Sequence, residues 1–523
     1  MSKPTKKSII KTTGIIGLAT SLSRILGFLR DIVIANLFGT GTAAQAFMVA
    51  FRIPNLLRDL VGEGATNAAF VPVLSEYHVS KSPQEYWRLA RIILNLLIIT
   101  TLFLTIFGMI FSQFIVKIMA PGFIREPEKL ILTIQMTKFI FPYIILVALA
   151  AYSMGILNSL GHFSSPAFGP CLFNITLILS GIFLCPLMGI WGLAWGVILG
   201  GIAQLAIQIP FMTRLGLVLD RSFALRHPGA KKIGLLLVPR ALGSAVYQLS
   251  IFVDTIIASF AGIVGAGGVA ALYYSNRLIQ LPMAIFAIAL ATVALPEMSR
   301  YAALNEIEKV KETLSFSIKW IFFMLMPAGV GLMCLGKPII RILFERGQFD
   351  SYSTNITQAA LFFYSIGLFA YGGVKIMVSA FYALHDTWTP VKTAGAALLI
   401  NVILNLILMW PLKIGGLALA TSISSIFNLL MLGWLLQKRI GHIGTIKIIK
   451  SFMSTLAASL AMYICCVPIS RKINDLINAK ESLLACVTLL LAIIASAGIF
   501  LVATYLLNSK DVKEMLQWAS KKK

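Results

Sequence analysis

The sequence predicts an all-α polytopic membrane protein with fourteen transmembrane helices: two parallel six-helix lobes around a central cavity, then two C-terminal helices. Three observations support this fold class. The 523-residue chain is 58% hydrophobic and only 12% charged, whereas a soluble globular chain carries about 25% charged residues. Its apolar runs are continuous, without the alternation of a barrel, and close to the ~20 residues that span a bilayer. The third observation is an internal repeat.

The apolar runs define the predicted helices in chain order. Six lie in the first lobe, near residues 13–37, 43–72, 90–115, 130–158, 165–185 and 190–213. Six lie in the second, near 233–261, 266–296, 314–336, 355–384, 390–410 and 415–437. The last two lie near 447–468 and 482–507. The predicted domains are therefore residues 1–222, 223–440 and 441–523, the last ending in a basic tail.

Proline and polar residues recur about 224 positions apart. The matched pairs are Asp31 with Asp254, Pro72 with Pro296, Ser75 with Ser299, Tyr77 with Tyr301 and Pro166 with Pro390. Chance matches of Leu or Ile are common in such a chain, but these residues at one offset are not. Six helices is an even number, so the lobes share one orientation, and parallel repeats typically enclose a transport site. The alternative is an old duplication that now serves only packing.

The charge of +24 would suggest a nucleic-acid partner in a soluble protein. In a membrane protein, Lys and Arg instead mark the cytoplasmic loops. They are concentrated at the termini and in the loops that follow even-numbered helices, which predicts two cytoplasmic termini and no nucleic-acid partner. The six cysteines lie in apolar runs without metal-ligand spacing, so they are interpreted as small hydrophobic residues.

Charged residues inside the predicted helices indicate a site. The deep basic residues are Arg24, Arg30, Arg52, Arg58 and Arg277, and the acids at that depth are Asp31, Asp59, Glu63 and Asp254. A charge at the bilayer centre costs about 2.5–3.5 kcal/mol, so such residues face a watery cavity or a partner. The surplus of guanidinium groups favours an anion, and their forked geometry suits pyrophosphate oxygens. The alternative is that the acids form structural pairs with the arginines.

A second polar set suggests a cation site. Asp254 lies mid-span, Asn401 and Asn405 share a helix face, and Thr421 lies in the next helix. A carboxylate with amide and hydroxyl oxygens suits Na+, whereas proton binding needs only the aspartate. A polar bond between helices is the other interpretation. No nucleotide-binding, metalloprotease or serine-hydrolase motif occurs, so we expect a transporter without cofactors, driven by an ion gradient, the membrane potential or a partner.

Several stretches resemble the MurJ/MviN family of lipid II flippases, in the MOP exporter superfamily. They are SRILGFLRD at 23–31, FRIPNLLR at 51–58, and Tyr273-Tyr274 before Arg277. The resemblance runs over essentially the whole chain. It implies alternating-access movement of lipid II, the undecaprenyl-pyrophosphate-linked peptidoglycan precursor, from the cytoplasmic to the outer leaflet of the inner membrane. It also implies membrane lipid and the cell-wall synthesis machinery as partners.

The resemblance assigns roles to matching residues. Pyrophosphate contacts fall on Arg24, Arg30, Arg52 and Arg277. Cavity and gate residues are Ser23, Asp31, Asn55, Arg58, Asp59 and Glu63. The Na+ site falls on Asp254, Asn401, Asn405 and Thr421. Three departures stand out: Gln45 replaces an acid of many relatives, Ala270 a serine, and Asn405 a carboxylate found in some cation-binding relatives.

Other functions stay open on the sequence alone. An exporter of another polyprenyl-linked saccharide would share these features, whereas a drug/cation antiporter of the same superfamily should favour acidic cavity residues. A membrane enzyme acting on polyprenyl phosphates needs an acid or nucleophile cluster at the membrane surface, and none stands out. A non-transporting cell-wall scaffold would tolerate loss of the buried arginines.

Overall fold

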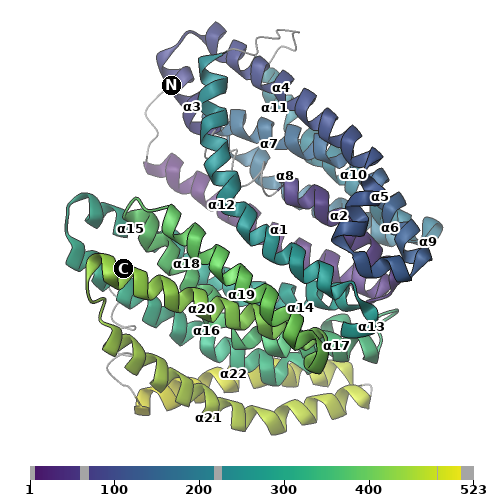
Figure 1. Cartoon of the computed structure of the whole chain (residues 1–523), viewed down its shortest axis with the longest axis vertical. Helices are drawn as coiled ribbons and strands as arrows, with labels where there is room; N and C mark the ends of the chain where they lie inside the picture. The colour runs from purple at the N-terminus through teal and green to yellow at the C-terminus, as the bar shows by residue number, and fades with distance from the viewer. Residues whose placement is uncertain (1–5, 59–69, 217–226, 480, 508–523) are drawn as a thin grey trace. The chain divides into compact units, whose positions relative to one another are not determined.

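The computed structural model describes residues 6–58, 70–216, 227–479 and 481–507, with only the backbone at 6–13, 57–58, 236–247 and 482. All regular elements within these ranges are helices (Figure 1). The chain forms two compact units, Met1–Ser259 and Phe260–Lys523.

Unit 1 consists of twelve α-helices and one short 3-10 helix in its described part. The α-helices are α1 (Lys6–Phe38), α2 (Thr42–Arg58), α3 (Val71–Ser80), α4 (Pro83–Ile110), α5 (Ser112–Met119), α6 (Pro127–Ile140), α7 (Tyr143–Ser159), α8 (Ser164–Phe183), α9 (Cys185–Met188), α10 (Trp191–Ala206), α11 (Ile209–Arg214) and α12 (Pro228–Ala258). The 3-10 helix η2 is Pro121–Arg125.

Unit 2 consists of ten α-helices and one π-helical stretch in its described part. The α-helices are α13 (Ala261–Val264), α14 (Gly268–Pro282), α15 (Ala289–Ala303), α16 (Ile307–Phe344), α17 (Ser351–Ile366), α18 (Leu368–Ala383), α19 (Trp388–Leu412), α20 (Ile414–Ile440), α21 (Thr445–Asn478) and α22 (Ser482–Leu507). The π-helical stretch η3, Met283–Ile288, joins α14 to α15.

These helices confirm the predicted helical, polytopic membrane fold. Among the described residues, ten helices are long and apolar enough to cross a membrane. The number rises to eleven if α17 and α18, which meet at a 47° bend, form one span. The exact count of fourteen stays a prediction, as do the predicted lobe boundaries.

Local sequence signals set several helix ends. Ser82 precedes α4 and its Oγ accepts a hydrogen bond from the Glu85 backbone N–H at 3.3 Å, while Pro83 occupies the first helical position. Asp350 caps α17 by accepting from the Ser353 N–H at 2.8 Å. Both caps satisfy backbone donors that lack partners in the first helical turn.

The core of unit 1 packs α1 and α2 against α6, α7, α8 and α10. Phe47, Tyr143 and Phe173 are buried at its centre. Tyr143 and Phe173 pack with ring centroids 5.5 Å apart, and Phe51 stacks on Phe47 at 5.7 Å. This packing fixes the two helices that carry the first predicted arginines.

In unit 2 the two C-terminal helices pack on α16. Figure 1 shows α21 and α22, at the yellow end of the colour scale, beside this long helix. Phe323 of α16 and Phe500 of α22 lie with ring centroids 5.1 Å apart, around buried Met462 and Cys466 of α21. Ser470 Oγ donates to the Cys334 carbonyl at 2.8 Å. The last two helices are thus integrated into the second unit.

One backbone feature recurs at the offset of the predicted repeat. Gly161, after α7, has φ of 79°, and His385, 224 residues later and after α18, has φ of 58°. This left-handed region suits glycine and is uncommon for other residues. The two turns therefore share an uncommon backbone conformation at the spacing of the predicted repeat.

Candidate functional site

Two arginines of α1 lie in different surroundings. Arg24 is exposed, whereas Arg30 is only 7% exposed and the neighbouring Asp31 is fully buried. The Arg30 guanidinium donates to Asp31 Oδ1 from Nε at 3.0 Å and from Nη2 at 2.8 Å. Its Nη1 donates to Asn174 Oδ1 of α8 at 3.0 Å. A buried pair with such additional hydrogen bonds offsets much of the cost of desolvating both charges.

Asn174 extends this network back along α1. Its Nδ2 donates to the Ser23 carbonyl at 3.1 Å, and the nearby Cys171 Sγ donates to the Ala19 carbonyl at 3.3 Å. The predicted residues Ser23, Arg30 and Asp31 are therefore brought together by α8. Sequence reasoning missed Asn174; the only available signal was a single amide within an apolar run.

Arg52 of α2 connects that helix to α12. Its Nη1 donates to the Ile251 carbonyl at 3.4 Å. The same carbonyl accepts a hydrogen bond from Thr255 Oγ1 at 2.7 Å. Asp254, 8% exposed, lies one turn beyond Ile251 on α12. Unit 1 thus brings a predicted pyrophosphate ligand to the helix turn that carries the predicted cation ligand.

The structure describes only some of the other site residues that were predicted on the second helix. Asn55 is half-buried next to Pro54, which lies inside α2 and removes one backbone donor there. Arg58 is the last residue of α2, and its side chain lies outside the described atoms. Asp59 and Glu63 fall outside the described residues.

Arg277 lies on α14 of unit 2 among polar neighbours. Its Nη1 donates to Gln280 Oε1 at 3.2 Å, and Gln280 Nε2 donates to Asn276 Oδ1 at 2.6 Å. The guanidinium carbon lies 5.7 Å from the ring centre of Tyr273. A cation–π contact of this kind helps to orient the guanidinium over the ring.

Three of the four predicted cation ligands form one network in unit 2. Asn401 Nδ2 donates to Thr421 Oγ1 at 3.2 Å, and Asn405 Nδ2 donates to Asn401 Oδ1 at 3.1 Å. Both asparagines are buried. Each acceptor oxygen has a second lone pair, so neutral oxygens suited to Na+ gather here. The fourth predicted ligand, Asp254, belongs to unit 1.

Across the described residues, no three His, Cys, Asp or Glu side chains gather to hold a metal ion. All three departures from the family pattern are buried: Gln45 is 3% exposed on α2, and Ala270 on α14 and Asn405 on α19 are fully buried. Among the site arginines, Arg24 is exposed, Arg52 and Arg277 are half-buried, and Arg30 is buried.

Comparisons with known proteins agree on one family. The sequence profile of the family described as "Lipid II flippase MurJ" matches residues 34–476. A probable lipid II flippase MurJ of Buchnera aphidicola (subsp. Acyrthosiphon pisum) is 36% identical over 436 residues, covering 83% of this chain and 84% of the relative. The lipid II flippase MurJ of Burkholderia cenocepacia is 33% identical over 426 residues, covering 80% and 82%.

Solved structures show the same relationship. The structure described as "Lipid II flippase MurJ, inward closed conformation" matches with a TM-score of 0.76 and 28% identity, covering 94% of this chain and 98% of that one. A multidrug-resistance MATE transporter of the MOP superfamily, in an inward-facing conformation, matches with a TM-score of 0.68 at 16% identity, covering 82% and 99%. At that identity the MATE match concerns the fold alone.

Proposed function

Because the chain belongs to the lipid II flippase MurJ family, we propose that it carries lipid II from the cytoplasmic to the outer leaflet by alternating access. The chain is a multi-pass membrane transporter of the MOP superfamily, and its substrate is lipid II. The MATE fold is shared by drug transporters, so the fold does not select the cargo. The family match and the basic residues of α1, α2 and α14 instead indicate lipid II as the cargo.

Arg24, Arg52 and Arg277 are the proposed ligands of the pyrophosphate. The observation that carries this assignment is the contrast on α1, where Arg24 is exposed while Arg30 is buried against Asp31. An exposed guanidinium can form a bidentate contact with phosphate oxygens. Arg30, although first expected to bind pyrophosphate, is better assigned as a positioning residue that holds α1 against α8.

Asp254 is the proposed coupling residue, and it binds a proton or Na+. Support comes from its burial and from its position one turn from the carbonyl that Arg52 contacts. A negative charge at this turn attracts the Arg52 guanidinium, and neutralising it weakens that attraction. Cation binding would then release Arg52 toward the substrate. For Na+, the family resemblance assigns Asn401, Asn405 and Thr421 as further ligands.

The proposal includes an orientation. The excess of basic residues at the termini and in the loops after even-numbered helices supports two cytoplasmic termini in the inner membrane. A reporter that is active only in the cytoplasm, fused after Lys523, would be active in this orientation. An inactive reporter on a stably inserted chain would reverse it. Contact with the cell-wall synthesis machinery is a further expectation from the cargo, which that machinery consumes.

The deciding experiment measures lipid II in the outer leaflet of cells that are depleted of their own flippase and express this chain. We expect the headgroup to become accessible from outside. Arg24→Ala, Arg52→Ala and Arg277→Ala should each abolish this accessibility at unchanged protein level in the membrane. Lys450→Gln, an exposed change on α21, is the matched control.

Three results would each overturn a part of the proposal. Lipid II that stays inside despite well-inserted protein would point to another polyprenyl-linked cargo or to a scaffold role. Transport by the triple arginine variant would remove the anion site. For the coupling residue, transport by Asp254→Ala that equals the unaltered chain across Na+ concentrations and pH values would remove the ion-binding assignment.

A further inference from the structure

The first turn of α12 packs closely on α3 and α4 within unit 1. Gly229 is the second residue of α12, and a Cβ placed on it would lie 2.8 Å from a methyl carbon of Leu89 on α4 and 3.1 Å from the Tyr77 ring on α3. His227, just before the helix, is only 6% exposed, and its ring centre lies 5.8 Å from that of Tyr77. A buried imidazole therefore lies where α12 begins.

Both ring nitrogens of His227 have partners. Nδ1 accepts a hydrogen bond from the Gly229 backbone N–H at 3.1 Å, and Nε2 lies 3.1 Å from Oε1 of Glu85 on α4. A backbone N–H can only donate and a carboxylate oxygen can only accept, so the ring proton belongs on Nε2. The imidazole thus satisfies both partners in one state, the neutral ring with its proton on Nε2.

Histidine is an unusual side chain for capping a helix. Asn, Asp, Ser and Thr are the usual choices because their oxygens accept from the first backbone donors. Pro228 has no N–H, so the Gly229 N–H is the first donor of α12, and His227 Nδ1 is its acceptor. A proton on Nδ1 would turn this acceptor into a donor and set two N–H groups against each other. Protonation therefore removes the cap.

Two ion pairs lie beside the imidazole. Arg88 Nη1 lies 3.7 Å from Glu85 Oε2 on α4, and Lys232 of α12 pairs with Glu76 of α3. Lys231 of α12 is exposed. Histidine is the side chain whose charge ordinarily changes between pH 5 and 8, so a pH change in that range acts on the imidazole rather than on these pairs.

A second imidazole in this region has different surroundings. His78 of α3 is exposed, and its ring packs on Tyr86 of α4 with ring centres 5.6 Å apart. The Tyr86 hydroxyl in turn lies 2.9 Å from Ser159 Oγ. His78 therefore offers a matched control for a histidine that titrates beside the same helices.

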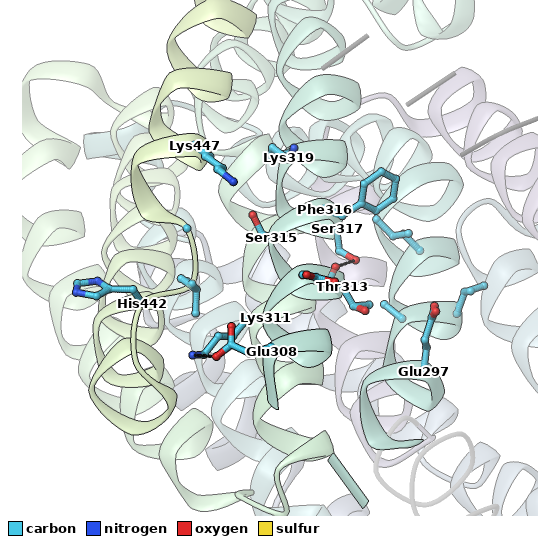
Figure 2. A pocket seen from close by; sticks show the side chains of 16 residues that line it. Glu297, Glu308, Lys311, Thr313, Ser315, Phe316, Ser317, Lys319, His442 and Lys447 are labelled. Carbon is cyan, nitrogen blue, oxygen red and sulfur yellow. Dashed lines mark hydrogen bonds and ion pairs between the residues drawn. The ribbon is translucent and has the colours of Figure 1, made fainter. Parts of the chain in front are cut away.

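The corresponding helix start in unit 2 is built without an imidazole cap. At the offset of the predicted repeat, α3 and α4 correspond to α15 and α16, and α21 begins where α12 does. Gly444 precedes α21 and gives its first turn no side-chain cap. Figure 2 shows the cavity of about 640 Å³ that lies between this helix start, α15 and α16. A helix can thus begin here without the contact that His227 makes.

We propose that His227 is a positioning residue that holds the start of α12 on α4 when neutral and releases it when protonated. On protonation the Gly229 N–H loses its acceptor, while the imidazolium stays with Glu85, so the first turn of α12 opens. Asp254 lies near the other end of the same helix. The opening itself is independent of the cargo, whereas its effect on transport rests on the proposed function of Asp254.

The experiment measures backbone hydrogen exchange in the full chain, purified in detergent, by mass spectrometry. Rates at pH 8 and pH 6 are corrected for the intrinsic pH dependence of exchange. We expect exchange in the first turn of α12 to become about fivefold faster at pH 6, the change expected from loss of a helix cap. The first turn of α21, which follows Gly444, is the internal control and should show no such step.

Three variants identify the titrating group. His227→Asn keeps an oxygen for the Gly229 N–H and an N–H for Glu85, so the first turn should stay closed at both pH values. His227→Ala should leave it open at both. His78→Asn should keep the pH step of the unaltered chain. If His227→Ala does not insert, the asparagine variant and the unaltered chain decide the question without it.

Each other outcome has a definite meaning. Exchange that does not depend on pH, or a pH step that persists in His227→Asn, would overturn the proposal. Loss of the step in His78→Asn would assign the titration to α3 and overturn it as well. In the lipid II assay, varying the internal pH should change the rate of the unaltered chain but not of His227→Asn. Equal pH profiles there, with the exchange step intact, would overturn only the link to transport.

Failure of the proposed function gives a different result. The exchange measurement contains no lipid II, so it reports on His227 even if the chain carries another cargo.

Discussion

Gly189 and Lys413, 224 residues apart, have nearly the same uncommon backbone conformation. Gly189, after α9, has φ of 60° and ψ of −139°, and Lys413, after α19, has φ of 51° and ψ of −129°. Each residue precedes a buried Gly-Leu-Ala sequence that opens the next long helix. Glycine adopts this conformation without strain, whereas a residue with a side chain does so at a cost.

Replacing Lys413 by glycine should therefore stabilise the protein. The relief of strain, on the order of 1–3 kcal/mol, exceeds the entropy that glycine adds to the unfolded chain. We expect the thermal unfolding midpoint in detergent to rise. Lys413→Ala, which keeps the strain, should not raise it, and Gly189→Ala should lower it. A gain of equal size in Lys413→Ala would trace the effect to the lost charge instead.

Arg30→Ala should reduce the amount of folded protein in the membrane. The change leaves Asp31 buried without its guanidinium partner, at a cost of about 3–5 kcal/mol. The double variant Arg30→Met with Asp31→Asn removes both charges and should recover much of the folded protein. Quantitative immunoblotting of membranes, together with the lipid II accessibility assay, checks both points.

That double variant also separates two roles for Arg30. Recovered protein that flips lipid II would show that Arg30 serves to position α1. Recovered protein without flipping would return Arg30 to the pyrophosphate site, as the family resemblance first implied.

Asp386 should make stability depend on pH in the acid range. Its carboxylate accepts from the Thr389 N–H at 3.0 Å and from Thr389 Oγ1 at 2.7 Å, and pairs with Arg439 at the end of α20. Burial raises the pKa of this carboxyl, but these hydrogen bonds and the Arg439 charge outweigh it and hold the pKa below its usual value.

Since the folded pKa is the lower one, the unfolded chain binds the proton more readily. The stabilisation from Asp386 is complete above the unfolded pKa, near 3.9, and is lost as pH falls through the folded pKa. Unfolding midpoints measured from pH 7 down to pH 3 should fall less steeply in Asp386→Asn. An unchanged slope would show that other carboxyl groups dominate in this range.

Arg341→Gln should loosen the last turn of α21. Arg341 of α16 donates to the Asn474 carbonyl and Oδ1, each at 3.2 Å, and to Asn478 Oδ1 at 2.8 Å. We expect faster backbone hydrogen exchange in this turn, measured by mass spectrometry. Lys337→Gln, exposed one turn earlier on α16, is the control. Exchange that is equally slow in both variants would mean that apolar packing alone holds α21.

Apolar runs predicted where helices lie but not how long they are. The predicted span at 314–336 is the central part of α16, Ile307–Phe344. Hydropathy reports the thickness of the hydrocarbon region, whereas the helix continues wherever its backbone bonds are satisfied. The 47° bend between α17 and α18 falls at Gly367, where a Cβ would lie 2.7 Å from the Ser422 Cα, so close packing against α20 accompanies it.

The site was predictable in its residue types and only in part in its contacts. Arg30 and Asp31 are adjacent, so the sequence could suggest a pair, and the structure describes one. Asn174 is 144 positions from Arg30, and only the packing of α8 on α1 brings it near. The proximity of Arg52 to the Asp254 turn arises in the same way, from helix packing rather than from spacing along the chain.

The length of α16 has a mechanical consequence. Its 38 residues extend about 57 Å, nearly twice the ~30 Å hydrocarbon thickness. Its first turns carry the ion pair between Glu308 and Lys311, and its last turn carries the Arg341 contacts to α21. Moving as a rigid body, a helix of this length would link the two membrane faces. A tilt of about five degrees displaces one end by roughly 5 Å relative to the other, so an event at one surface can be felt at the opposite surface without a relay of side chains.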